Sequence, residues 1–199
     1  MSINIVNSNI RLIIMVSLTI TLMSACMPNG NNTRSPTITP NDGTISLSEL
    51  GKGKIAYASG SGDDLDIYLM NLDGSGRVNL TNNPSYDTIP SWSPDGKYIV
   101  FESNRNNNHD IYTINIENSK TKRITLDEAD DRYPAWSPDG TRLTFQSTRD
   151  TFDNIYVMNA DGSHVIKITN NLERAVNEQA DWSPDGQKVV FLVTVIFMP

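Results

Sequence analysis

Short runs in which apolar and polar residues alternate occupy most of the chain beyond residue 52, and they recur in register. Residues 55–59 correspond to residues 99–103 and 143–147, and each run is rich in β-branched or aromatic side chains. Alternation with a period of two over this length indicates a half-buried β-strand. No sustained 3.6-residue apolar period occurs outside the N-terminal segment, so the sequence predicts an all-β protein.

A pentapeptide, Trp-Ser-Pro-Asp-Gly, occurs at residues 92–96, 136–140 and 182–186, at spacings of 44 and 46 residues. Its proline sets φ near −65° for the first central position of a turn, and its glycine supplies a positive φ. The pentapeptide therefore predicts a tight hairpin between a strand that ends in tryptophan and the strand that follows. Repetition at this period indicates a repeated structural unit.

Each unit is expected to contain four antiparallel strands, which we name A to D in chain order. Strand A ends in the tryptophan, B carries the alternating run, C carries Asp-Ile-Tyr or Asn-Ile-Tyr, and D ends in Leu-Thr or Ile-Thr. Asp-Gly pairs at 73–74 and 161–162, and residues 117–119, mark the hairpin between C and D. The fold class is all-β: a partial β-propeller of four-stranded antiparallel blades, about three blades plus the start of another. Thirteen strands are expected between residues 53 and 199; the first unit lacks strand A, and no spare strand is expected to supply it.

These motifs resemble the TolB-like, WD-repeat-like β-propeller family over residues 53–191. The Ser-x-Arg element of that family is present at residues 103–105 and 147–149, and residues 59–61 have lost its arginine. The resemblance implies a propeller whose partners are other envelope proteins. Residues that recur once per blade are assigned to the core and the turns: Trp92, Trp136, Trp182, Tyr68, Tyr112, Tyr156, Gly96, Gly140 and Gly186.

The N-terminal 26 residues differ from the rest of the chain. An apolar stretch at 12–25 follows Arg11 and ends in Met-Ser-Ala before Cys26, the only cysteine. This pattern resembles a bacterial lipoprotein signal peptide, with Cys26 lipidated and the protein exported to the cell envelope. A buried apolar helix or an uncleaved anchor is the alternative. Residues 27–52 have linker composition, and residues 53–199 form the incomplete propeller.

The C-terminal residues 192–198 are apolar and stop in the middle of a blade. We expect a truncated or frame-shifted gene product; a genuine last strand that caps the sheet is the alternative. Blades that do not close a ring leave open sheet edges, which favour self-association.

Charge narrows the choice of partners. With 23 acidic and 16 basic residues the net charge is −7, which argues against nucleic acid and against direct binding to anionic lipid. Membrane contact is expected through the lipid anchor only. No cofactor is expected, and the acidic clusters contain only weak calcium candidates: Asp63, Asp64, Asp130 and Asp131.

No catalytic set is evident, so a non-enzymatic protein is predicted. The two histidines, His109 and His164, are interpreted as surface residues because a general base needs a positioned partner. Asp66 and Asp110 occupy the same blade position, where they are expected to accept from backbone donors or to pair with the arginines of the Ser-x-Arg elements, Arg105 and Arg149.

Binding is expected on the B–C and D–A loops, which emerge on one face. The candidate contact residues are Tyr86, Asp87, Arg132, Tyr133, Arg105 and Arg149. Packing of the two tyrosines near the following strand is an equal alternative. The leading hypothesis is a lipid-anchored scaffold that binds an envelope protein or peptide. The others are a propeller fragment of a larger envelope enzyme (a prolyl-peptidase-like protein or a polysaccharide lyase) and a glycan-binding module.

Overall fold

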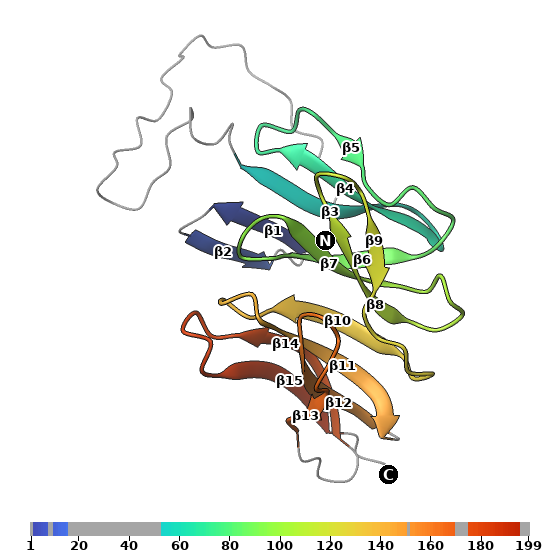
Figure 1. Ribbon diagram of the computed structural model, residues 1–199, viewed down its shortest axis with the longest axis vertical. Coiled ribbons are helices and arrows are strands. Elements are labelled where there is room, and N and C mark those ends of the chain that lie inside the picture. Colours follow the sequence, from blue (N-terminus) through green and yellow to red (C-terminus); the bar gives the residue numbers. More distant parts are fainter. Residues whose placement is uncertain (1, 8–9, 16–52, 151, 170–174, 196–199) are drawn as a thin grey trace, which may run out of the picture.

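The computed structural model describes residues 2–7, 10–15, 53–150, 152–169 and 175–195 (Figure 1). These residues form β-strands and turns, which confirms the all-β prediction. None of them belongs to a helix that could cross a lipid bilayer. Cys26 and the linker 27–52 lie outside the described residues.

The strands from β3 to β15 form four successive antiparallel sheets. The first contains β3 (Lys54–Ser61), β4 (Asp64–Asn71) and β5 (Val78–Asn79). The second contains β6 (Asp87–Trp92), β7 (Tyr98–Ser103), β8 (Asp110–Asn115) and β9 (Thr121–Arg123). The third contains β10 (Asp131–Trp136), β11 (Arg142–Asp150), β12 (Phe152–Asn159) and β13 (Ile166–Lys167). The last contains β14 (Ala175–Trp182) and β15 (Val189–Val195).

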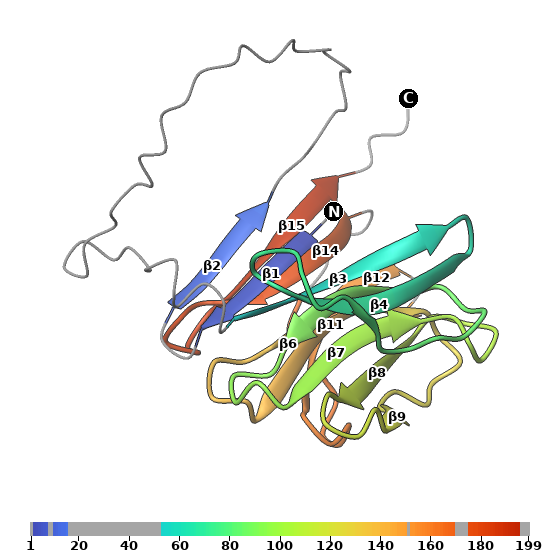
Figure 2. The same cartoon turned by 90° about the horizontal axis from the view of Figure 1, so that it is seen from above.

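These thirteen strands, β3 to β15, confirm the blade pattern within the described residues. From β3 to β15, the strands of each sheet pair in chain order, as Figure 2 shows for β6, β7, β8 and β9. Figure 1 shows the sheet of β3–β5 at the top of the view and the sheets of β10–β15 toward the bottom. Because neighbouring strands are antiparallel, the A–B and C–D hairpins lie at one end of each sheet and the B–C and D–A loops at the other. We call the second end the loop end.

The first sheet differs from the prediction at its inner edge, where no strand was expected. Strand β1 (Ser2–Asn7) pairs with β3 antiparallel, with Ile5 opposite Ile55, and β2 (Ile10–Met15) pairs with β1. An unpaired edge presents backbone N–H and C=O groups that an extended, β-branched segment can satisfy. Both strands fall inside the segment interpreted as a signal peptide, and cleavage after residue 25 would leave the edge of β3 open.

The pentapeptide turns have the expected geometry. Gly96, Gly140 and Gly186 have φ of 70°, 72° and 68°. In the first copy the backbone N–H of Gly96 donates to the carbonyl of Ser93 at 2.9 Å, and the Ser93 hydroxyl donates to Asp95 at 2.6 Å. The same hydroxyl accepts from the backbone N–H of Tyr98 at 2.9 Å. The serine and the aspartate thus satisfy the polar groups of the turn locally.

The tryptophans lie between adjacent sheets and not on a ligand-facing surface. Trp92 packs in a buried cluster with Ile67 and Leu69 of the first sheet and Phe101 of the second. Trp136 occupies the same place one blade later, between the second and third sheets. Large aromatic residues in such cores contribute strongly to stability. Blade-to-blade packing therefore explains why a tryptophan recurs once per blade.

The outer face of the β14–β15 sheet is more exposed than the corresponding face of other blades. Val190 is 69% exposed, whereas Val100, which stands at the same strand position in the second sheet, is 0% exposed. Leu192, two residues further along and on the same face, is 54% exposed. In the second sheet this face is covered by the next blade.

Candidate functional site

Two of the predicted contact arginines hold the A and B strands together near the loop end. Arg105 donates twice from Nη2 to the carboxylate of Asp87, at 3.0 and 2.8 Å, and its Nε donates to Ser103 at 2.9 Å. Its guanidinium also lies 4.7 Å from the ring centre of Tyr112. Only 24% of the Arg105 side chain is exposed, so most of its hydrogen-bonding capacity is used inside the blade.

Arg149 repeats this arrangement one blade later. It donates to the fully buried Asp131 at 2.9 and 3.0 Å and stacks 4.9 Å from the ring centre of Tyr156. Burial raises the pKa of Asp131, although Ser147 and Arg149 act in the opposite direction. The expected pairing of Arg105 and Arg149 with the aspartates of strand C is therefore wrong, because the start of strand A lies closer to them.

The strand C aspartates bind strand D instead. Asp110 pairs with Arg123 at 2.9 Å and accepts from the hydroxyl of Thr125 at 3.3 Å. Burial raises the pKa of Asp110 against the effect of Arg123. Asp66 accepts from the hydroxyl of Thr81 at 2.9 Å and from the backbone N–H of Asn83 at 3.1 Å, so the alternative expectation, a backbone donor, holds for this residue.

In the first blade, an arginine from the C–D connection takes the place of the missing Ser-x-Arg arginine. Arg77 donates to Ser59 at 3.1 Å and lies 4.3 Å from the ring centre of Tyr68. This is the position that Arg105 takes relative to Ser103 and Tyr112 in the next blade. Tyr68 is nevertheless only half-buried, whereas Tyr112 is buried.

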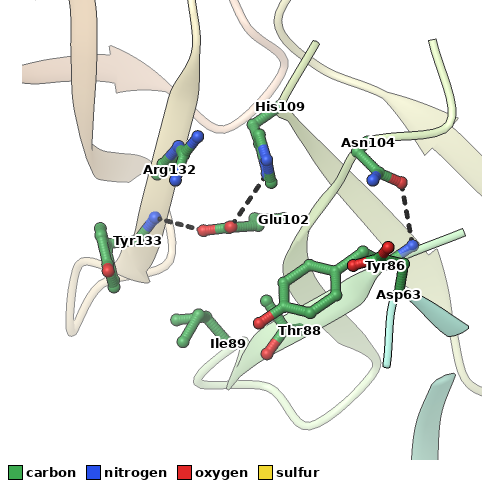
Figure 3. Close-up of a pocket in the computed structure, with 9 residues that line it drawn as sticks. All are labelled: Asp63, Tyr86, Thr88, Ile89, Glu102, Asn104, His109, Arg132 and Tyr133. Atoms are coloured by element: carbon green, nitrogen blue, oxygen red, sulfur yellow. Dashed lines mark hydrogen bonds and ion pairs between the residues drawn. The ribbon is translucent and has the colours of Figure 1, made fainter. Parts of the chain in front are cut away.

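A cavity of about 370 Å³ opens at the loop end between the first, second and third sheets (Figure 3). It is lined by Asp63, Tyr86, Thr88, Ile89, Glu102, Asn104, His109, Arg132 and Tyr133. Three of these residues, Tyr86, Arg132 and Tyr133, belong to the contact set predicted from the sequence. We call this hollow the loop-end cavity.

A repeated β-bulge in strand A shapes the wall of the cavity. The pairing of β6 with β7 shifts between Thr88 and Ser91, and that of β10 with β11 shifts between Arg132 and Ala135. Within these shifts Ile89 and Tyr133 each have a φ of 52°. A β-branched residue at positive φ is strained, typically by about 1–3 kcal/mol, and such strain is concentrated at functional sites.

Glu102 and His109 both line the cavity. The Glu102 side chain is 5% exposed and that of His109 is 20% exposed. As Figure 3 shows, Glu102 lies between His109 and Tyr133: its Oε1 is 3.1 Å from Nδ1 of His109, and its Oε2 accepts from the backbone N–H of Tyr133 at 3.2 Å. His164 is exposed in a C–D hairpin, as expected, whereas His109 is half-buried and lies beside a carboxylate.

The two tyrosines combine the alternatives left open by the sequence: each is half-buried and each lines the cavity. The backbone N–H of Tyr86 donates to the side-chain oxygen of Asn104 at 2.9 Å, and its ring meets that of His109 edge-on at 6.2 Å. Burial raises the pKa of the Tyr133 hydroxyl, and the charges of Glu102 and Glu178 act in the same direction.

The remaining acidic candidates do not form a metal site in the described residues, where no group of three potential ligands could hold an ion. Asp130 pairs with Arg132 at 2.9 Å and accepts from the backbone N–H of His109 at 3.0 Å. Despite burial, these hydrogen bonds hold the pKa of Asp130 below its usual value. Asp63 lines the cavity, and its neighbour Asp64 starts strand β4.

Sequence reasoning missed Glu102 and the bulges. Strand β7 is buried on both faces from Ile99 to Ser103. Because glutamate is rarely buried without a partner, its presence in such a strand could have indicated a polar site. The bulges had no comparable signal, because Ile89, Tyr133 and Gln179 share no residue type that favours positive φ.

Two family models match the chain. Residues 51–132 match the TolB beta propeller domain, and residues 109–185 match the dipeptidyl peptidase IV N-terminal region. No protein with a curated description matches the chain.

Solved structures share the fold. The putative TolB of Agrobacterium tumefaciens is 30% identical with a TM-score of 0.66, over 71% of this chain and 50% of that one. TolB of Acinetobacter baumannii is 31% identical with a TM-score of 0.62, over 69% and 34%. An oligogalacturonate lyase of Vibrio parahaemolyticus, 17% identical with a TM-score of 0.56 over 76% and 46%, shares the fold alone. This chain thus spans about half of the first relative and a third of the second. By its repeats, its sheets and these matches, the chain is a TolB-like β-propeller protein.

Proposed function

We propose that this protein is a non-enzymatic binding scaffold of the cell envelope, and that it holds a protein or peptide at the loop end of its blades. The observation that carries the proposal is the loop-end cavity, to which three consecutive sheets contribute side chains. Loops on a rigid scaffold commonly carry binding residues. The two family matches and the TolB structures supply the fold that presents such a surface.

The side chains of the cavity suit polypeptide binding. Tyr86 and Tyr133 are half-buried and offer ring faces with few rotatable bonds, a feature of residues that dominate interface energies. Arg132 adds a partly exposed guanidinium, with 36% of its side chain exposed. By contrast, Arg105, Arg149 and the carboxylate of Asp87 are engaged inside the blades, so we assign them to positioning the loops.

A binding role also accounts for His109 without assigning it chemistry. Its nearest carboxylate, Glu102, accepts a hydrogen bond from the backbone of the next blade, which is a contact that joins sheets. General base catalysis would require a substrate proton held within about 2.6–3.2 Å of the ring nitrogen. The Nδ1 atom faces Glu102, so only Nε2 could take such a proton, and the proposal assigns it none.

Envelope location and lipid anchoring are part of the proposal and rest on residues 1–26. Lipidation at Cys26 would attach the protein to a membrane, and the linker of residues 27–52 would separate the blades from the bilayer by roughly 25–30 Å. Metabolic labelling with a clickable palmitate analogue tests this. The Cys26→Ser protein should carry no label and should be absent from the membrane fraction. A labelled or membrane-bound Cys26→Ser protein would contradict the lipid anchor.

Photo-crosslinking in cells tests the binding site. A photoreactive amino acid is placed at position 86 or 133 in the cavity and, as a control, at position 118 in an exposed C–D hairpin at the opposite end. We expect a discrete crosslinked polypeptide from the cavity positions only. Equal crosslinking from position 118, or no adduct from either cavity position, would argue against the proposed site.

A further inference from the structure

The buried carboxylates of the described residues differ in how their charge is compensated. They belong to Asp87, Asp110, Asp131 and Glu102. Each aspartate has an arginine nitrogen within 2.8–2.9 Å. Glu102 has no lysine or arginine at ion-pair distance in the described part of the chain; it has the backbone N–H of Tyr133 and the Nδ1 atom of His109. Burying a carboxylate without a charged partner is costly.

The fold itself does not require a carboxylate at this position. In the strand register Glu102 stands opposite Ile111, as Ala58 stands opposite Ile67 in the first sheet and Gln146 opposite Ile155 in the third. One blade is therefore built with a methyl group here and another with a neutral amide. The charge of Glu102 needs an explanation other than blade packing.

The surroundings of Glu102 favour a cation. The cavity volume of about 370 Å³ falls in the range of roughly 300–1,000 Å³ that is typical of ligand pockets. The ring of Tyr86 and the side chain of Asp63 face the same hollow (Figure 3). The guanidinium of Arg132 is matched by Asp130 at 2.9 Å, so it does not compensate Glu102. Aromatic rings and a carboxylate without a lysine or arginine partner together attract cations.

The geometry at Glu102 distinguishes between kinds of cation. Because Oε2 already accepts from the N–H of Tyr133, only Oε1 is directed at the His109 side of the cavity for a further bond. A guanidinium binds best to both oxygens of a carboxylate at once, whereas an ammonium acts as a point charge on a single oxygen. An ammonium therefore suits Oε1, which faces Nδ1 of His109, better than a guanidinium does.

We propose that the loop-end cavity binds an ammonium group of the partner polypeptide, either a lysine side chain or a free N-terminus, with Glu102 as its counter-ion. The tyrosine rings form the walls around the aliphatic carbons next to the nitrogen. This inference rests on the proposed binding function and specifies the chemical group that the site recognises.

Titration of the full chain with small amides tests the inference. The probes are N-acetyl-lysine methylamide, its neutral counterpart N-acetyl-norleucine methylamide, and alanyl-alanine amide with a free or an acetylated N-terminus. Binding is followed through the backbone amide signals of Tyr133 and His109 by nuclear magnetic resonance. We expect saturable shifts with the lysine amide, the free-amine dipeptide or both, and none with the neutral probes; the responsive probe identifies the source of the ammonium.

The decisive variant is Glu102→Gln, which keeps an acceptor for the Tyr133 N–H and copies the residue found at position 146. It should weaken binding of the ammonium probes about tenfold or more, because a neutral amide replaces the charged acceptor of the ammonium hydrogen bond. Asp95→Asn removes one carboxylate from an exposed turn at the opposite end and should leave binding unchanged. Equal response to the neutral probes, no response to any probe, or undiminished binding in Glu102→Gln would overturn the inference.

The two proposals fail in different ways. If cavity crosslinking in cells persists unchanged in Glu102→Gln while the ammonium probes give no response, the binding function stands and the ammonium inference is wrong. If the probes respond as expected but no polypeptide is crosslinked at positions 86 and 133, the ammonium site stands and the polypeptide-binding function is wrong.

Discussion

Replacing Arg149 with glutamine should destabilise the protein strongly, and it should do so through Asp131. The Asp131 side chain is fully buried, and Arg149 supplies two hydrogen bonds to it, at 2.9 and 3.0 Å. The substitution also removes the bond from Nε to Ser147 at 2.8 Å and the stacking on Tyr156. Removing one partner of a buried ion pair leaves an uncompensated charge and typically costs about 3–5 kcal/mol.

Arg132→Gln is the matched control for this change. Arg132 pairs with Asp130 at 2.9 Å, the same distance, but the two side chains are 36% and 35% exposed. An ion pair open to solvent contributes only about 0–1 kcal/mol. The two substitutions remove the same charge from adjacent strands of one sheet, so their difference reports the effect of burial together with the lost Ser147 and Tyr156 contacts of Arg149.

Urea unfolding followed by tryptophan fluorescence measures both variants. With a slope of about 1–3 kcal/mol per molar urea, Arg149→Gln should lower the midpoint by roughly 1–5 M, and Arg132→Gln by much less. Adding Asp131→Asn to Arg149→Gln should recover part of the loss, because the orphaned charge is removed. Equal midpoints for the two single variants, or no recovery in the double variant, would refute the assignment of Arg149 to blade stability.

Three further predictions follow from the core and the turns. Trp136→Ala should destabilise the protein by about 3–5 kcal/mol, measured by urea unfolding, because the side chain fills the contact between two sheets; a cost below about 1 kcal/mol would contradict that role. Gly96→Ala should cost about 1–2 kcal/mol by the same assay, from its φ of 70° alone, since an added Cβ meets nothing within 4 Å. Gly162→Ala should cost more, because its Cβ would also lie 2.6 Å from the carbonyl oxygen of Ile124; equal costs would refute the clash. The carboxyl of Asp139 should titrate at about pH 2 by nuclear magnetic resonance, because hydrogen bonds from Ser137 and Thr141 lower its pKa from 3.8. Because the pKa of Asp139 is lower in the folded than in the unfolded protein, its ionised carboxylate stabilises the folded state. The difference in unfolding free energy between the wild type and Asp139→Asn should therefore be complete above about pH 4 and be lost as the pH falls through about 2. A pH-independent difference would contradict this.

Much of the fold could be predicted because its determinants are local. The alternating runs, the Pro-Asp-Gly turns and the Ile-Thr ends each act within one strand or hairpin. The structure shows the physical reason for the last of these: the hydroxyl of Thr125 accepts from the backbone N–H of Ile111 at 2.9 Å and donates to Asp110, which joins strands C and D. The same pair recurs with Thr169 and Asn154, where an amide oxygen replaces the carboxylate as acceptor.

The candidate site was only partly predictable. Tyr86, Arg132 and Tyr133 were found because aromatic and charged residues in loops are visible in the sequence. The partners of Arg105 were misassigned because Asp87 and Asp110 are both plausible by spacing, and the choice between them depends on which strand edge faces the guanidinium. Strand β1 was missed for a similar reason, since an open edge can pair with any extended segment that reaches it.

The sequence by itself determined the repeat, the hairpins and the order of strands in each blade, because these depend on residues that are close along the chain. Only the tertiary structure decided what lies between blades. Glu102 and Tyr133 are 31 residues apart, and their hydrogen bond is made at a bulge that the residue types in the sequence do not predict. Their contact depends on how one rigid sheet packs on the next, and that packing creates both the cavity and the buried charge within it.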